Sequence, residues 1–304
     1  MAAAAIALAV ASVNMLRKVE PFFSYFYCFA WWSYIVGAEA YLYRKRGSSP
    51  VVEEPGRYLL HLPFSVTLWL LFEVFNFRLA NWQYVNVVEQ VPQRWLGYWV
   101  SFATVLPGLF VTQRLLDHLG VACTFSVTPL KSAERLCGPL IAAGALMLFL
   151  PLLWPRCFFP LLWLAFIFLV EPFNYKFGGE SLLRELQGGD ARRILLLALS
   201  GAICGFLWEF WNYWAGSKWV YTIPFLDFLK VFEMPLLGFL GFPPFAVECY
   251  VMANACFLLL GRAPWRSTRR LGRSTWIFGG IFLLFLHLLV FRGIDHFTVA
   301  SFRR

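Results

Sequence analysis

Eight long apolar stretches dominate the sequence and limit what it can fold into. Each has the length of about 18 residues or more that an α-helix needs to cross a bilayer, with few charges. Backbone polar groups in lipid must be satisfied within the segment, so we expect helices, and the stretches lack the alternation of β-barrel strands. We therefore predict an all-α, polytopic integral membrane bundle of about eight transmembrane helices, forming a single membrane domain over residues 1–304. The predicted spans are 22–43, 58–76, 95–115, 137–154, 157–174, 193–214, 235–261 and 275–292.

The composition agrees with this architecture. Hydrophobic residues make up 60% of the chain, the mean hydropathy is +0.64 and charged residues make up 14%. A soluble domain carries about 25% charged residues. Within the seventh span, Pro243 and Pro244 predict a kink or a break.

Basic residues indicate how the chain is oriented. Four loops hold 16 of the 26 Lys and Arg residues, and such loops face the cytosol in most membrane proteins. Both termini are then expected outside, in a bacterial inner membrane. The apolar residues 2–13 lack a preceding basic segment, so we expect a short helix at or dipping into the interface rather than a signal peptide. The loops predicted to be cytosolic are 44–57, 113–136, 175–193 and 262–274.

Several classes of site are not supported. The net charge of +9 fits basic cytosolic loops, and no basic run is interleaved with stacking aromatics, so we expect no nucleic acid partner. None of the seven cysteines forms a Cys-x-x-Cys pair, and the four histidines lack metal-ligand spacing. We predict no disulfide framework and no metal site, and the sequence implies no cofactor.

Two segments, about 58–115 and 193–261, share an ordered set of residues. Each has Glu-x-x-Asn at the end of a span, then Trp-x-Tyr, then a Glu shortly before Pro and the next span. This predicts a duplicated helix-loop-helix running in the same direction twice, and repeats in membrane proteins often hold the working site at their interface. The residues are Glu73, Asn76, Trp82, Tyr84, Glu89 and Pro92 in the first copy, and Glu209, Asn212, Trp219, Tyr221, Glu233 and Pro235 in the second.

The repeated acids are the candidate catalytic residues. Glu73 and Glu209 lie about one turn inside their helices, where a carboxylate is costly and is usually functional or paired. A cluster of this kind can hold and deliver a proton, with Glu233 or Glu89 assisting. Alternatively, the acids cap helix starts or pair with basic residues near them. The residues expected to bind substrate are Asn76, Asn212, Trp82, Tyr84, Trp208, Trp211, Trp219 and Tyr221.

Two further polar residues fall within predicted spans. Glu248 lies near the middle of the seventh span and His287 lies within the eighth, so both are functional candidates, able to share a proton if their helices touch. A third Glu-x-x-Asn, Glu171 to Asn174, lacks the following Trp-x-Tyr and is interpreted as a structural helix end.

The second copy, from Leu207-Trp208-Glu209 through Trp219-Val220-Tyr221 to residues 235–242, resembles the small membrane-embedded lycopene cyclase family. The resemblance covers residues 200–250 and, more weakly, 65–115. Where that family has a Glu-Glu pair thought to supply the cyclising proton, this chain has Leu237-Gly238. The resemblance therefore implies a fold from a duplicated three-helix unit and an apolar, isoprenoid-like ligand, but not lycopene cyclase activity itself.

Three functional hypotheses remain open. The first is a membrane enzyme that modifies an isoprenoid or another membrane lipid by carboxylate acid/base chemistry. The second is a proton- or cation-coupled transporter or channel that uses Glu248, His287 and the repeated acids. The third is a non-catalytic membrane subunit.

Overall fold

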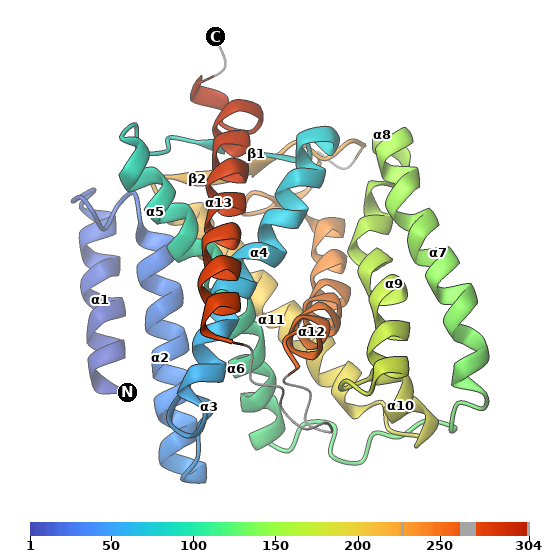
Figure 1. The fold of residues 1–304 in the computed structure, drawn as a ribbon. Coiled ribbons are helices and arrows are strands. Elements are labelled where there is room, and N and C mark those ends of the chain that lie inside the picture. Colours follow the sequence, from blue (N-terminus) through green and yellow to red (C-terminus); the bar gives the residue numbers. More distant parts are fainter. Residues whose placement is uncertain (226–227, 262–271, 303–304) are drawn as a thin grey trace.

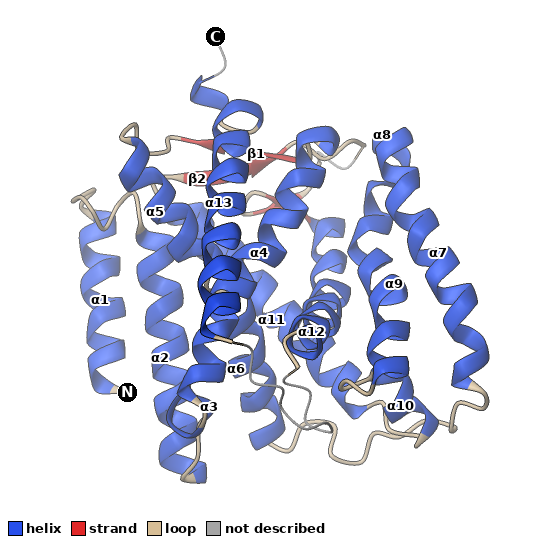
Figure 2. Cartoon of the chain, in the orientation of Figure 1, coloured by secondary structure: helices blue, strands red, loops and turns tan. Residues whose placement is uncertain are grey.

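The computed structural model describes residues 1–225, 228–261 and 272–302. Most of them are helical, and short strands form two-stranded ribbons near one end of the molecule (Figure 2). The α-helices are α1 (Ala2–Leu16), α2 (Phe26–Arg46), α3 (Pro50–Glu53), α4 (Pro55–Leu79), α5 (Val91–Phe102), α6 (Val105–His118), α7 (Ala133–Leu153), α8 (Pro155–Phe158), α9 (Leu162–Phe177), α10 (Leu182–Gln187), α11 (Arg192–Trp214), α12 (Phe242–Leu259) and α13 (Arg273–Phe297). The strands are β1 (Trp82–Val85), β2 (Lys218–Tyr221), β3 (Lys230–Val231) and β4 (Met234–Pro235), and the 3₁₀ turns are η1 (Phe159–Leu161), η2 (Leu236–Gly241) and η3 (Ala300–Phe302).

The predicted helical membrane architecture is confirmed. In the described part of the chain, seven helical segments are long and apolar enough to cross a membrane, and they overlap seven of the eight predicted spans. The remaining predicted span, 22–43, corresponds to α2. This helix has 21 residues but carries Glu39 and a basic last turn, and it is not one of the seven. It runs beside the others through the bundle (Figure 1).

The N-terminal helix differs from its predicted placement. It does not lie across the bundle at an interface, because α1 runs antiparallel to α2 and packs along it (Figure 1). In Figure 1 the chain begins in the lower part of the bundle, and α13 ends at its upper end. The predicted side of the membrane for each terminus stays a prediction. The lower end of the bundle holds the loops that follow α2 and α6. Residues 262–271 of the predicted basic loop 262–274 lie outside the described residues.

Two of the long segments are interrupted. The segment Val91–His118 is broken between α5 and α6, and the segment Leu236–Leu259 is a 3₁₀ turn, η2, followed by α12. The predicted break at Pro243 and Pro244 is present, with both prolines in the first turn of α12. A proline is tolerated there because the first helical N–H groups have no partner within the helix.

Close packing at the centre places α11 against α6 and α12. Gly205 on α11 permits the closest approach, because a Cβ atom there would lie 2.2 Å from the Phe242 ring. The core is rich in aromatic residues, including the fully buried Trp31 and Phe72. Phe72 of α4 stacks on Trp163 of α9 at 5.3 Å between ring centroids. These contacts hold α4, α9, α11 and α12 together beneath the ribbons.

Candidate functional site

An antiparallel ribbon joins the two copies of the repeated motif. Strand β1 of the first copy pairs with β2 of the second, so that Trp82 lies opposite Tyr221 and Tyr84 lies opposite Trp219. Because side chains two residues apart lie on the same face of a strand, these four aromatic side chains share one face. The ribbon spans the upper end of the bundle in Figure 1.

Glu73 is held at the centre of the first copy. Its Oε1 atom accepts hydrogen bonds from Trp69 Nε1 at 2.8 Å, Trp82 Nε1 at 3.1 Å and the Tyr84 hydroxyl at 2.5 Å. The Glu73 side chain is fully buried, and its Oε2 atom has no hydrogen-bond partner among the described residues. These three hydrogen bonds to one oxygen hold the carboxyl group in place, and they also hold the three aromatic rings in place.

Glu209 occupies the equivalent place in the second copy. Its Oε1 atom accepts a hydrogen bond of 2.8 Å from the Tyr221 hydroxyl, which in turn accepts one of 2.9 Å from Trp219 Nε1. The side chain is fully buried, and no described residue forms a hydrogen bond with Oε2. Each repeated acid is thus bound by the Trp-x-Tyr of its own copy.

The repeated asparagines position the strands. The Asn212 side chain donates to the Trp219 carbonyl oxygen at 2.9 Å and accepts from the Trp219 N–H at 3.0 Å. Asn76 donates to the Trp82 carbonyl oxygen at 2.9 Å and accepts from the N–H groups of Trp82 and Asn81. Both asparagines are buried, and both contact strand backbone rather than a cavity. They act as the link between the helix end and the strand.

The two tyrosines of the ribbon donate their hydroxyl protons to the two buried acids. Burial, and then the neighbouring Glu73 carboxylate, raises the pKa of Tyr84 well above its usual value. Burial, and then Glu209, does the same to the pKa of Tyr221. Both phenols therefore keep their protons at neutral pH and continue to donate to the acids.

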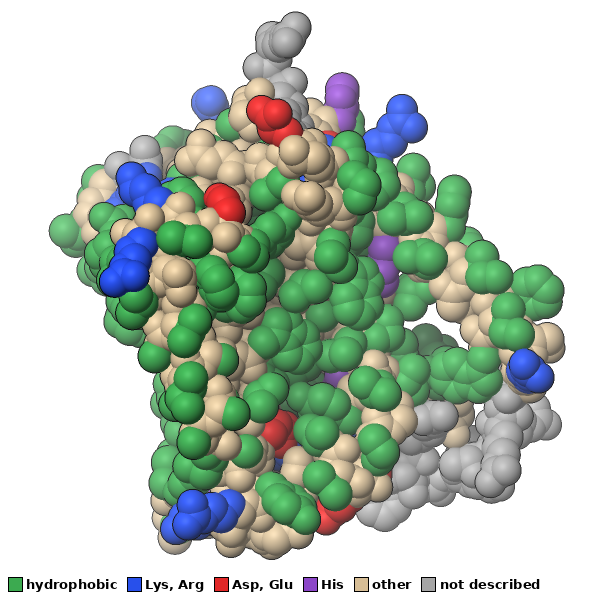
Figure 3. Space-filling view, turned by 90° about the vertical axis from the view of Figure 1, so that its left-hand side faces the viewer, with side chains coloured by type: hydrophobic (Ala, Val, Ile, Leu, Met, Phe, Trp, Pro, Cys, Tyr) green, Lys and Arg blue, Asp and Glu red, His purple; other side chains and the backbone are tan. Residues whose placement is uncertain are grey.

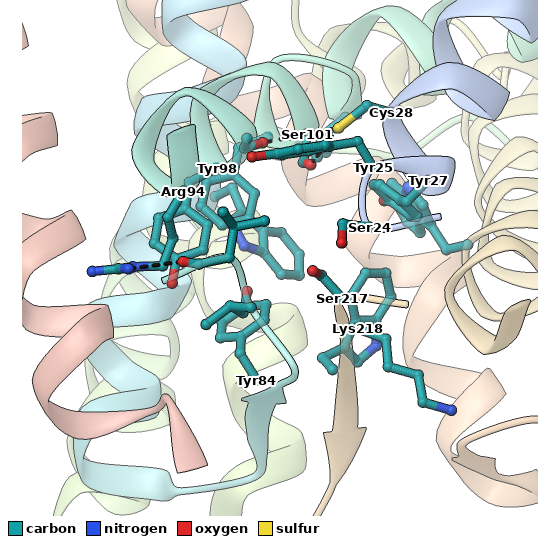
Figure 4. A pocket seen from close by; sticks show the side chains of 18 of the residues that line it. Ser24, Tyr25, Tyr27, Cys28, Tyr84, Arg94, Tyr98, Ser101, Ser217 and Lys218 are labelled. Carbon is teal, nitrogen blue, oxygen red and sulfur yellow. Dashed lines mark hydrogen bonds between the residues drawn. The ribbon is translucent and has the colours of Figure 1, made fainter. Parts of the chain in front are cut away.

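A cavity of about 100 Å³, the central cavity, lies beneath the ribbon between the two copies. In Figure 4, Tyr25 and Cys28 lie at its end near Ser101, and Tyr84 and Lys218 lie at the other. Glu209 is the acid in its wall. The central cavity is lined by Ser24, Tyr25, Tyr27, Cys28, Trp69, Tyr84, Val87, Val88, Arg94, Gly97, Tyr98, Ser101, Phe102, Val105, Trp208, Glu209, Ser217, Lys218, Trp219, Tyr221 and Phe242.

A second cavity of about 350 Å³ lies on the side of η2 and α9. Trp82 and Trp163 contribute to its wall, and Trp69, Trp219, Tyr221 and Phe242 line both cavities. The shared aromatic rings therefore form a partition between the two spaces. Glu73 lines neither cavity, although its three hydrogen-bond donors do.

Three more of the predicted site residues line neither cavity. Glu89 is exposed, and its backbone carbonyl accepts a hydrogen bond from Arg94 at 2.6 Å. Glu233 forms an ion pair of 2.5 Å with Lys218 instead of joining the other acids. Trp211 packs in the core against Trp31, with ring centroids 4.9 Å apart, and lines neither cavity. Trp208, in contrast, lines the central cavity beside Glu209.

Glu248 and His287 have separate partners. Glu248 on α12 is fully buried and accepts a hydrogen bond of 2.7 Å from the Phe166 N–H of α9. His287 on α13 forms a hydrogen bond of 2.9 Å with Thr67 on α4. Glu171 accepts from the Ser181 hydroxyl and the Leu183 N–H, which fits its interpretation as a structural helix end. The proposed proton sharing between Glu248 and His287 is replaced by these bonds.

The sequence analysis missed a polar cluster beside the central cavity. Arg94 donates to both Asp295 carboxylate oxygens at 2.8 Å, and Trp95 and Tyr98 donate to the same carboxylate. Arg94 and Tyr98 also line the cavity. Arg94 and Asp295 are 201 residues apart, so no local pattern pointed to the pair. Trp69 was also missed, although it lies four residues before Glu73 and hence on the same helix face.

Within residues 1–225, 228–261 and 272–302, no three His, Cys, Asp or Glu side chains group as a metal site. No family model, curated protein or solved structure matches the chain. The resemblance to the lycopene cyclase family over residues 200–250 therefore stays a prediction.

Proposed function

We propose that the protein is a membrane enzyme that modifies an isoprenoid-like lipid whose reacting end lies in the central cavity, with Glu209 as the catalytic acid and base. One observation carries the proposal. Glu209 is in the cavity wall, with Oε1 held by Tyr221 and with the buried Oε2 unpartnered among the described residues. A buried oxygen without a partner is a site where a reacting group binds at little cost, because no existing hydrogen bond must break.

The adjacent residue supports a ligand that carries a polar end. Trp208 also lines the central cavity, and its buried Nε1 donor has no hydrogen-bond partner among the described residues. The Trp208 donor matches an oxygen atom at the polar end of the ligand, so the free oxygen of the Glu209 carboxyl remains available to the reacting carbon atoms. The rest of the wall is largely apolar and aromatic, as an isoprenoid chain requires.

The aromatic wall also suits the chemistry. Proton transfer from the Glu209 carboxyl to a carbon–carbon double bond forms a new C–H bond and leaves a carbocation. Attack by an intramolecular double bond can form a C–C bond and move the positive charge to another carbon. Loss of a proton from a carbon next to the cation to the Glu209 carboxylate then restores neutrality and regenerates the acid, so the net reaction is an isomerisation that needs no co-reactant. Trp69, Trp219 and Tyr221 line the cavity, and aromatic faces stabilise a nearby cation.

Glu73 has a different role in this proposal. It lines neither cavity and accepts three hydrogen bonds from Trp69, Trp82 and Tyr84. It is a positioning residue that holds the aromatic partition. The matching contacts around Glu73 and Glu209 support an internal duplication. In this proposal the acid of the second copy, Glu209, is catalytic, and the acid of the first copy, Glu73, is structural.

The orientation of the site is part of the proposal. The end of the bundle opposite the β1–β2 ribbon holds the loops that follow α2 and α6, which belong to the basic set predicted to be cytosolic. We place that end in the cytosol of a bacterium, with the ribbon and the cavity toward the outside. The N-terminus is then cytosolic and the C-terminus external.

The transporter hypothesis receives less support. Glu248 accepts from the Phe166 backbone and His287 binds Thr67, and neither residue lines the central cavity. Between the ribbon end and the opposite end, the buried face of α6 includes the apolar Leu106, Leu109 and Val111. A continuous polar path through the bundle has no support in these contacts.

Expression in cells that make isoprenoids tests the function. The lipid extract of cells with the wild-type protein is compared with extracts of cells carrying Glu209→Gln or Glu134→Gln. Glu134 is exposed on α7 and serves as the matched control. We expect an altered isoprenoid with wild type and Glu134→Gln but not with Glu209→Gln. Identical profiles for wild type and Glu209→Gln would overturn the acid/base role.

A further inference from the structure

A wide groove lies beside the central cavity, between α1, α2 and α5. It has a volume of about 790 Å³, and its walls are largely apolar. Small side chains of α1, Ala3, Ala4 and Ala7, form one wall, and Trp32 of α2 and Leu96 of α5 form part of the others. We call it the α1–α5 groove.

The α1–α5 groove lies on the outside of the bundle. Leu96 is 64% exposed and Val36, also in its wall, is 55% exposed. The face of the molecule on the α1 side is covered by apolar side chains across its middle, with basic side chains near its upper and lower margins (Figure 3). A face of this kind contacts the hydrocarbon chains of the bilayer, and its basic margins lie at the headgroups.

Three residues line both the groove and the central cavity: Tyr25, Cys28 and Gly97. The Tyr25 ring lies directly against Gly97, where a Cβ atom would come within 2.7 Å of its Cε1 atom. Beside them, Cys28 Sγ lies 3.0 Å from the Ser101 hydroxyl. The groove and the cavity are therefore separated by these shared residues, of which Tyr25 has the largest side chain.

We propose that the α1–α5 groove is a lateral portal through which a single alkyl or isoprenyl chain passes from the bilayer into the central cavity, with Tyr25 as its gate. The occupant follows from the chemistry of the walls. An apolar chain already dissolved in the bilayer loses no hydrogen bonds on entering an apolar groove, whereas a water-soluble ligand would have to shed its hydration. Because Gly97 has no Cβ atom, the Tyr25 ring can pack against the backbone there. When the ring turns away, the same space is open to the chain.

The portal rests on the proposed function, because it leads to the same cavity, and the test separates the two. The purified protein in lipid vesicles is mixed with a long-chain isoprenol that carries a photoreactive diazirine at its apolar end. Irradiation at increasing times, followed by peptide mapping, gives the rate at which the probe reaches the central cavity, read from labelling of Tyr98 and Val105, which line that cavity and not the second one. Labelling of Leu96 reports occupancy of the groove.

The variant Ala7→Trp places a large ring in the groove from an exposed position on α1. Its matched control is Ala5→Trp, which puts the same ring on the same helix at an exposed residue that does not line the groove. We expect cavity labelling to slow about 10-fold or more in Ala7→Trp, with the same final extent, and to be unchanged in Ala5→Trp. A portal changes the rate of entry and of exit together, so the equilibrium occupancy is preserved. The gate variant Tyr25→Ala should speed labelling instead.

The outcomes are distinct. Equal labelling rates in wild type and Ala7→Trp would overturn the portal and leave the cavity as the ligand site. Labelling of Leu96 without labelling of Tyr98 or Val105 at any time would overturn the proposed function, and the portal with it. Slower entry in Ala7→Trp together with faster entry in Tyr25→Ala supports the portal.

Discussion

The Tyr221 hydroxyl donates a hydrogen bond of 2.8 Å to Oε1 of Glu209. Tyr221 is also paired with Trp82 of the other motif copy in the β1–β2 ribbon. The ribbon therefore connects the proposed catalytic acid to the first copy. Trp82 in turn donates to Glu73. The orientation of Glu209 depends in this way on contacts made by both copies.

Replacing Tyr221 by Phe removes the described hydrogen bond to Glu209 and leaves both carboxylate oxygens without a described partner. Loss of one bond to a buried acceptor costs about 1–3 kcal/mol. We expect the rate of lipid modification to fall by about 10-fold or more, because a misplaced catalytic group slows the reaction steeply. Tyr213→Phe, at an exposed position, is the control. Equal rates for Tyr221→Phe and wild type would show that the hydroxyl does not position Glu209.

Replacing Asn212 by Ala removes the two hydrogen bonds that hold the Trp219 backbone. We expect the free energy of unfolding to fall by about 1–3 kcal/mol, since two buried backbone groups lose their partner. Thermal unfolding in a fixed detergent measures the change, and Asn76→Ala should give a similar loss. The control Asn14→Ala on α1 removes only an exposed hydrogen bond to the Val10 carbonyl oxygen and should leave the melting temperature nearly unchanged. A melting temperature of Asn212→Ala equal to that of Asn14→Ala would contradict the positioning role.

Replacing Asp295 by Ala leaves the buried Arg94 guanidinium without its carboxylate. Breaking such a pair by removing one partner costs about 3–5 kcal/mol, whereas removing both is far less costly. We therefore expect a large drop in melting temperature for Asp295→Ala and partial recovery in the double variant Arg94→Met, Asp295→Ala. A double variant that is less stable than Asp295→Ala would show that the pair does not dock α13 onto α5.

The sequence predicted the helices well because apolar length is a local property. It also assigned Glu73, Trp82 and Tyr84 to one candidate site, since the repeat places the same residues at nearly the same intervals twice. Trp-x-Tyr was expected in a loop, however, and the pairing of β1 with β2 could not be foreseen. It joins segments from two distant parts of the chain, and strand register has no signal in short aromatic runs.

Other features depended on contacts that are distant in sequence. Glu89 and Glu233 share a motif position, yet Glu89 is exposed and Glu233 pairs with Lys218, because only the second loop folds back onto its strand. The N-terminal helix was expected at the interface, but its small side chains allow α2 to pack along it. The pattern of apolar residues along the sequence did not show where Glu89, Glu233 and the N-terminal helix pack.

The most direct test of the central claim is deuterium incorporation from solvent. Membranes that contain isoprenoid lipids are incubated in D₂O with purified wild type, Glu209→Gln or Glu73→Gln, and the lipids are analysed by mass spectrometry. Glu209 exchanges its proton with solvent, so each turnover should place one deuterium in a lipid product. The rate should fall by about 100-fold or more in Glu209→Gln, as expected for loss of a general acid. Glu73→Gln, which keeps the acid in the cavity wall, should retain more activity at a lower melting temperature. Equal incorporation by wild type and Glu209→Gln, or none by wild type, would contradict the assignment of Glu209 as the catalytic acid.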